Sequence, residues 1–164
     1  ACSPPPLGVP PSDSPVAPCL TAGTVLRAAD LSFPTIAKRF ADINLPSPEE
    51  SRRAYRELLF TTRGLNEFIS GTILFDETIR QTLKDGVAMP EALAKQGIIP
   101  GIKVDKGTVA LVNFAGEKVT QGLDGLRERL AEYRELGARF TKWRAVITIA
   151  EHIPTCDCLE ANDD

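Results

Sequence analysis

Histidine and cysteine are scarce in this chain of 164 residues. It contains one histidine, His152, and four cysteines, which are Cys2, Cys19, Cys156 and Cys158. Zinc sites need several such ligands at regular spacings, and Cys156 and Cys158 lack the two-residue spacer of zinc and redox pairs. We therefore expect no metal site and no disulfide framework.

Long apolar runs and blocks of like charge are also missing. No stretch approaches the roughly 20 apolar residues that span a bilayer, and the start lacks the basic segment and apolar core of a signal peptide. The formal net charge is −3, with residues of both signs interspersed. This distribution gives no electrostatic basis for binding nucleic acid or an anionic membrane. We expect a cytoplasmic protein without nucleic-acid or membrane partners.

Proline is concentrated at one end of the chain. Residues 1–20 contain seven of the thirteen prolines and almost no periodic apolar residues. This composition predicts a disordered or polyproline-like leader over residues 1–22, which is either a spacer or a non-native leader, with a ligand for a proline-binding domain as the alternative. Residues 23–164 have the length and apolar content of one globular domain.

Short apolar runs alternate with helical patterns in the rest of the chain. The strand-like runs cover residues 25–30, 71–75, 98–104 and 140–149, and the helical patterns start at 36–40 or cover 48–61, 90–96 and 123–136. No hairpin signal separates them, so the order predicts an α/β fold with a parallel sheet and crossover helices. The last helix has an apolar stripe formed by Leu123, Leu126, Leu130 and Tyr133, and Gly137 ends it.

Charged residues lie at the ends of the last two predicted strands. Since side chains alternate along a strand, Lys103 and Asp105 share one face. Lys142 and Arg144 also share a face, with Trp143 on the opposite, core-facing side. The carboxyl ends of parallel strands form the sites of α/β folds. We therefore expect these four charges to converge on one pocket.

Six motifs occur in one order along the chain. They are residues 28–30 (AAD), 52–59 (RRAYRELL), 73–78 (ILFDET), 101–107 (GIKVDKG), 120–126 (TQGLDGL) and 142–144 (KWR). Together they resemble the bacterial form of class I fructose-bisphosphate aldolase, over about residues 24–162. The resemblance implies the first four β/α units of a TIM (β/α)8 barrel. It also implies the glycolytic, reversible cleavage of fructose 1,6-bisphosphate to dihydroxyacetone phosphate and glyceraldehyde 3-phosphate, through a lysine Schiff base and without a cofactor.

The resemblance also implies roles for individual residues. Asp30 corresponds to the catalytic carboxylate that binds the substrate C4 hydroxyl and helps to position the Schiff-base lysine. Lys142 corresponds to the catalytic cation that assists carbinolamine chemistry. Lys103 and Arg144 correspond to phosphate ligands, which suits a compact ammonium and a bidentate guanidinium.

The loop after Asp30 departs from the family pattern. The family motif continues Glu-Ser-Thr-Gly, whereas this chain has Leu31, Ser32, Phe33 and Pro34 at these positions. Proline fixes φ and removes a backbone N–H, so we expect a differently shaped loop.

Four further residues match substrate-binding positions of the family. Ser32 and Thr35 keep hydroxyls where the family binds phosphate, and Arg39 and Arg52 match further substrate contacts. For Arg52, charge pairs within its own helix are the alternative explanation.

The sequence ends just after the fourth predicted strand, whereas a full barrel takes about 250 residues. The regions that supply the family's Schiff-base lysine, its acid/base glutamate and the second phosphate pocket are absent. We therefore expect the chain alone to be inactive and to bind sugar phosphates weakly. Open sheet edges predict a homo-oligomer or a complex with the complementary C-terminal half.

Two other functions remain open. The first alternative is a non-catalytic pseudoenzyme fragment that binds sugar phosphate or pairs with an intact aldolase. The second is a small lyase that uses Lys103 or Lys142 as its own Schiff-base lysine. The absence of a glutamate partner for proton transfer counts against the second of these.

Overall fold

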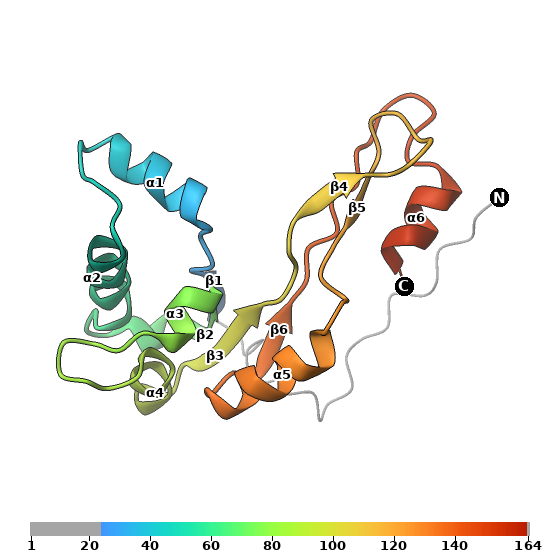
Figure 1. The fold of residues 1–164 in the computed structure, drawn as a ribbon. Coiled ribbons are helices and arrows are strands. Elements are labelled where there is room, and N and C mark those ends of the chain that lie inside the picture. The colour runs from blue at the N-terminus through green and yellow to red at the C-terminus, as the bar shows by residue number, and fades with distance from the viewer. Residues whose placement is uncertain (1–23, 164) are drawn as a thin grey trace.

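A four-stranded parallel sheet forms the centre of the computed structural model, which describes residues 24–163. The strands follow the order β1, β2, β3, β6 across the sheet (Figure 1). Their bounds are β1 Val25–Ala28, β2 Ile69–Leu74, β3 Ile99–Lys103 and β6 Phe140–Lys142. All three pairings are parallel, which confirms the predicted sheet. The predicted leader over residues 1–22 lies outside the described residues.

Helices follow each strand of this sheet. They are α1 Phe33–Ala41, α2 Glu49–Phe60, the 3₁₀ turn η2 Leu65–Glu67, α3 Asp76–Arg80, α4 Met89–Lys95, α5 Leu126–Glu135 and α6 Cys156–Asp163. The chain therefore repeats a strand followed by helical structure four times, as in the first half of a (β/α)8 barrel. The predicted α/β class and its crossover helices are confirmed.

Two elements differ from the sequence prediction. An antiparallel hairpin, β4 Thr108–Ala110 with β5 Lys118–Thr120, lies between β3 and α5, where no hairpin was expected. In addition, β6 ends at Lys142 and not at residue 149. The reason is that its neighbour β3 ends at Lys103, and the backbone pairing of the two strands extends to the bond from Val104 N to Lys142 O, at 3.1 Å.

The main core lies where the helices cover the sheet. Its fully buried members include Phe60, Leu74, Met89, Leu93, Ile98 and Ile102. Trp143 packs against this core, as predicted, and so do Leu126 and Leu130 of the α5 stripe. Leu123, by contrast, is 55% exposed because it precedes the helix.

A smaller apolar cluster is formed by Ile73 and Phe140, with Leu26 and Ile99 packed against them. Gly101 belongs to the same region, because a Cβ added there would lie 2.3 Å from the Phe140 ring. Only glycine therefore fits between β3 and this ring.

The β4–β5 hairpin is held by α6, and both extend away from the sheet in Figure 1. Asn162 accepts a hydrogen bond from Thr120 N at 3.1 Å and donates one to Lys118 O at 2.9 Å. The Glu117 carboxylate accepts from Thr155 N at 2.7 Å and from its hydroxyl at 2.8 Å. The Thr120 hydroxyl also donates to Arg144 O at 3.0 Å, so the hairpin fixes the backbone just beyond β6.

Candidate functional site

The carboxyl ends of β1 and β6 are joined by an ion pair. Lys142 is the last residue of β6, and its Nζ lies 2.6 Å from Asp30 Oδ2, two residues beyond β1. The side chains are 28% and 10% exposed, respectively. Since β2 and β3 lie between the two strands, the pair brings together both of the residues predicted to be catalytic. No sequence spacing indicates a contact across 112 positions.

Lys103 at the end of β3 is held by the turn that follows it. Its Nζ donates to Asp105 Oδ1 at 2.5 Å and to Asp105 O at 2.7 Å. This contact confirms that the two side chains share a face. Gly107 N also donates to Oδ1, at 3.3 Å. The other carboxylate oxygen, Oδ2, is buried and has no hydrogen-bond partner among the described residues.

A cavity of about 730 Å³ opens at this edge of the sheet. Lys103, Asp105, Arg144 and Ser32 line it. Three of the four charges expected to converge therefore share the cavity, and the fourth, Lys142, instead makes the ion pair with Asp30. Lys103 and Lys142 are partners in the β3–β6 register, so both groups lie at the same level of the sheet.

The segment after β1 supplies two hydroxyls, Ser32 at the N-cap of α1 and Thr35 in its first turn. Ser32 Oγ lies 3.0 Å from Thr35 Oγ1, and Ser32 borders the cavity. Thr35 does not line it, and neither do the other two predicted contacts. Arg39 is exposed near the end of α1. Arg52 lies against Glu77, with Nη2 and Oε1 2.6 Å apart.

Glu77 joins α3 to two arginines of α2. Arg52 and the buried Arg56 both donate to its carboxylate. Partial burial raises the pKa of Glu77, but these hydrogen bonds outweigh that effect and hold the pKa below its ordinary value.

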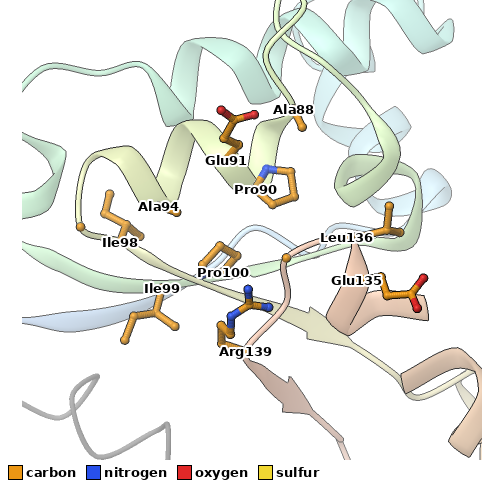
Figure 2. Close-up of a pocket in the computed structure, with 12 residues that line it drawn as sticks. Ala88, Pro90, Glu91, Ala94, Ile98, Ile99, Pro100, Glu135, Leu136 and Arg139 are labelled. Carbon is orange, nitrogen blue, oxygen red and sulfur yellow. The ribbon is translucent and has the colours of Figure 1, made fainter. Parts of the chain in front are cut away.

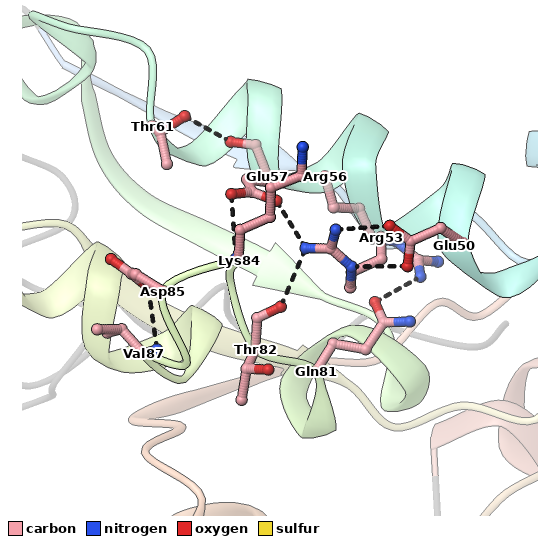
Figure 3. Close-up of polar contacts among 10 residues, drawn as sticks. All are labelled: Glu50, Arg53, Arg56, Glu57, Thr61, Gln81, Thr82, Lys84, Asp85 and Val87. Carbon is pink, nitrogen blue, oxygen red and sulfur yellow. Dashed lines mark hydrogen bonds and ion pairs between the residues drawn. The ribbon is translucent and has the colours of Figure 1, made fainter.

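The neighbouring arginine of α2 pairs within its own helix. Arg53 binds Glu50 and Glu57, as Figure 3 shows, at 2.8 and 2.6 Å. The intrahelical explanation considered for Arg52 therefore applies to Arg53, whereas Arg52 reaches another helix.

Sequence reasoning missed several residues near the cavity. Arg129 donates to Val104 O at 3.0 Å and to Gly122 O, which fixes the turn after β3. Tyr133 donates to Asp76 Oδ1 at 2.9 Å. Burial is the main cause of the raised pKa of the Tyr133 phenol, and the Asp76 carboxylate raises it further. A guanidinium or phenol that bonds groups 7 to 57 positions away leaves no local sequence signal.

A second cavity, of about 660 Å³, lies at the opposite end of β3. Figure 2 shows Pro90, Ile98, Pro100 and Leu136 around it, together with Arg139. None of the residues predicted to bind substrate lines this cavity.

Comparison with known proteins identifies the family. The sequence model described as "Glycolytic: Fructose-bisphosphate aldolase class-I" matches residues 16–164. The chain belongs to the class I fructose-bisphosphate aldolase family. This result confirms the resemblance carried by the six motifs.

Individual aldolases are similar over most of the chain. The probable fructose-bisphosphate aldolase class 1 of Xanthomonas axonopodis pv. citri is 61% identical over 140 residues, which are 85% of this chain and 42% of the relative. The cytoplasmic isozyme of Spinacia oleracea is 53% identical over 135 residues, 82% of this chain and 38% of the relative. This chain thus spans about two fifths of the length of these relatives.

A solved aldolase structure supports the fold. The Plasmodium falciparum aldolase, solved in complex with TRAP and a small-molecule inhibitor, matches with a TM-score of 0.86 and 48% identity. The match covers 90% of this chain and 43% of that one. The sheet and helices are therefore part of an aldolase TIM barrel. Across residues 24–163, no helix is long and apolar enough to cross a membrane.

Proposed function

We propose that this chain supplies part of the active site of a class I fructose-bisphosphate aldolase, which reversibly cleaves fructose 1,6-bisphosphate to dihydroxyacetone phosphate and glyceraldehyde 3-phosphate. The observation that carries the proposal is the Asp30–Lys142 ion pair next to a cavity lined by Lys103 and Arg144. The carboxylate and the amine of the ion pair can exchange protons with a sugar. The cationic groups of Lys103 and Arg144 can bind its phosphate.

The phosphate end consists of Lys103, Arg144 and the two hydroxyls of Ser32 and Thr35. An ammonium supplies a compact charge, and a guanidinium supplies a planar fork for two phosphate oxygens. Asp105 neutralises Lys103 in the free protein, so an arriving phosphate must share the ammonium with this carboxylate. Binding is therefore expected to be weak and to weaken further with added salt.

Asp30 and Lys142 carry the catalytic roles. A carboxylate 2.6 Å from the Lys142 Nζ fixes the position of that group at the carboxyl end of β6. In our proposal, Asp30 binds the C4 hydroxyl and Lys142 assists the carbinolamine step. Arg39 and Arg52 contribute less directly, since neither lines the cavity.

The Schiff-base lysine belongs, in this proposal, to the part of the aldolase fold that these 164 residues do not span. The chain alone then binds sugar phosphate without turning it over. Catalysis requires a complementary C-terminal half, and a homo-oligomer of this chain is the other way to cover the open edges of β1 and β6. A cytoplasmic location is proposed from the similarity to the spinach cytoplasmic isozyme.

The alternative proposal is a non-catalytic fragment that binds sugar phosphate. Borohydride trapping with dihydroxyacetone phosphate tests whether this chain has Schiff-base chemistry of its own, with peptide mass spectrometry as the readout and a full-length aldolase as the positive control. The two proposals themselves differ in the activity expected with the complementary C-terminal half: cleavage of fructose 1,6-bisphosphate supports the active-site role, and its absence supports the non-catalytic fragment. No adduct on this chain, together with measurable binding of the same compound, supports the division of roles. An adduct on Lys103 or Lys142 contradicts it and indicates independent Schiff-base chemistry.

The binding residues are tested by calorimetric titration with dihydroxyacetone phosphate. Lys103→Ala and Arg144→Ala should each weaken binding by about tenfold, the effect of losing one charge-assisted contact. Lys95→Ala is the matched control, because Lys95 is 61% exposed on α4, pairs with Glu91 in its own helix and does not line the cavity. Equal effects at all three positions would exclude a defined phosphate site.

A further inference from the structure

We propose that Phe33 is a positioning residue for the phosphate end of the site, because it holds the loop after β1 against α2 and α3. The inference rests on the function proposed above, since it concerns the same cavity. Phe33 makes no substrate contact in this account and acts through its neighbour Ser32.

Two contacts fix the Phe33 ring. It packs against the Phe75 ring in a T-shaped arrangement, with ring centroids 5.4 Å apart and planes at 84°. The Arg52 guanidinium carbon lies 4.8 Å from the ring centroid. Phe33 itself is 47% exposed, so burial in the core does not place it. Its position therefore depends on an aromatic pair and a cation–π contact, both of which have defined geometry.

We call the two contacts of Phe33, with Phe75 and with Arg52, the Phe33 clamp. Hydrogen bonds fix its Arg52 side. Both Nε and Nη2 donate to the Glu77 carboxylate, with Nη2 2.6 Å from Oε1 and Nε 3.1 Å from Oε2. Nη1 donates to Ser47 O. Because the guanidinium is bound by both the Glu77 carboxylate and Ser47 O, its plane has a defined orientation against the Phe33 ring. Through Arg52 the loop is anchored to α2, and through Phe75 it is anchored where β2 leads into α3.

The segment held by this clamp borders the cavity on both sides of Phe33. Ser32 and Pro34 line the cavity together with Lys103. The Ser32 hydroxyl makes no capping bond to α1 and instead pairs with Thr35. Ser32 adjoins Phe33 directly, so a shift of the ring moves Ser32, which lines the cavity together with Lys103 and Arg144.

The clamp also explains two features of the sequence. Phe33 and Pro34 stand where the family motif has a small and a flexible residue, and together they stiffen the loop, one through its ring contacts and one through its fixed φ. Arg52, which matched a substrate contact, acts on the site through Phe33 instead of touching the ligand.

Backbone ¹⁵N NMR and titration with dihydroxyacetone phosphate test the proposal on the same samples. We expect Phe33→Ala to lower the heteronuclear NOE at the Ser32 and Thr35 amides and to raise the dissociation constant about threefold to tenfold, from the usual strength of such contacts. Phe33→Tyr should retain wild-type values for both. Phe68→Ala is the control, because Phe68 is an aromatic side chain that is 66% exposed and lines no part of the cavity.

A double variant distinguishes the two possible roles of Arg52. Arg52→Met should match Phe33→Ala, and the combination should be no weaker than either single change, because both remove one clamp. Additive losses would overturn the proposal and make Arg52 a ligand. Glu77 retains Arg56 in Arg52→Met, so the α2–α3 contact survives.

Other results also decide the matter. Unchanged NOE values in Phe33→Ala overturn the proposal, and so does a loosened loop with unchanged affinity. If the wild-type chain does not bind dihydroxyacetone phosphate, the proposed function fails. The NOE values of Ser32 and Thr35 then still show whether Phe33 holds the loop: a drop supports the clamp, and no change overturns it.

Discussion

Gly101 lies in the middle of β3, where the ring of Phe140 occupies the space that a side chain would need. A Cβ on Gly101 would lie 2.3, 2.4 and 2.7 Å from three ring carbons. Ordinary contact between carbon atoms needs about 3.5–4.0 Å. The two residues are partners in the β3–β6 register, so neither can move without disturbing the sheet. Gly101 has no positive φ, so the cost of adding a side chain here is steric.

Gly101→Ala should therefore destabilise the fold by about 1–3 kcal/mol, the usual cost of overpacking a core. For a chain of this size each kcal/mol lowers the melting temperature by about 2–4 °C, which gives a shift of about 2–12 °C. Urea unfolding followed by far-UV circular dichroism measures the free energy directly. Phe140→Leu removes the clashing ring, so Gly101→Ala should cost at least about 1 kcal/mol less in that background.

Gly86→Ala is the control for adding a methyl group without a clash. Gly86 has φ +84° and nothing within 4 Å of its Cβ, so its cost is backbone strain alone. That cost should be the same with Phe140 or Leu at position 140. Strict additivity of Gly101→Ala and Phe140→Leu would refute the steric explanation.

Two further predictions concern charged groups. The pKa of Glu77 is lowered in the folded chain, so its stabilisation is present above the unfolded pKa of about 4.3 and is lost as pH falls through the folded value. Glu77→Gln should therefore flatten the loss of unfolding free energy as pH falls below about 4.3, whereas Glu91→Gln, at an exposed site, should not. Equal acid limbs in the two variants would count against the contact of Glu77 with Arg52 and Arg56. Asp105→Asn removes the anion that competes for Lys103, and about 1 kcal/mol of relieved repulsion should tighten inorganic phosphate binding roughly fivefold; weaker binding in a titration would mean that Asp105 mainly orients Lys103.

The main sheet and its helices were predictable because their signals are local. Apolar runs and helical spacing placed β2, β3, α2 and α4 within two residues of their observed bounds. Strand alternation predicted that Lys103 and Asp105 share a face, and the structure brings them into contact although Asp105 lies in the turn after β3. Collinear motifs then identified the family, which no periodicity could do.

The features that were missed depend on contacts between distant segments. The β4–β5 hairpin has strands of only three residues each, too short for an alternating pattern. It is stabilised by Asn162 of α6 and by Thr155, just before α6, which donates to Glu117 of the hairpin. The end of β6 is set by the length of β3. The partner of Arg52 lies 25 positions away on α3, where nothing in the sequence of α2 indicates it.

The contact between Asp30 and Lys142 makes the site a late product of folding. Its partners are separated by 112 positions, so closing this loop costs more chain entropy than any strand pairing of the sheet. Because β2 and β3 lie between β1 and β6, we expect the contact to form after these two strands have paired. A partly folded chain therefore has no site. A ligand that binds there favours only the fully assembled sheet and should protect β1 and β6 from unfolding together, although they are the two outer strands.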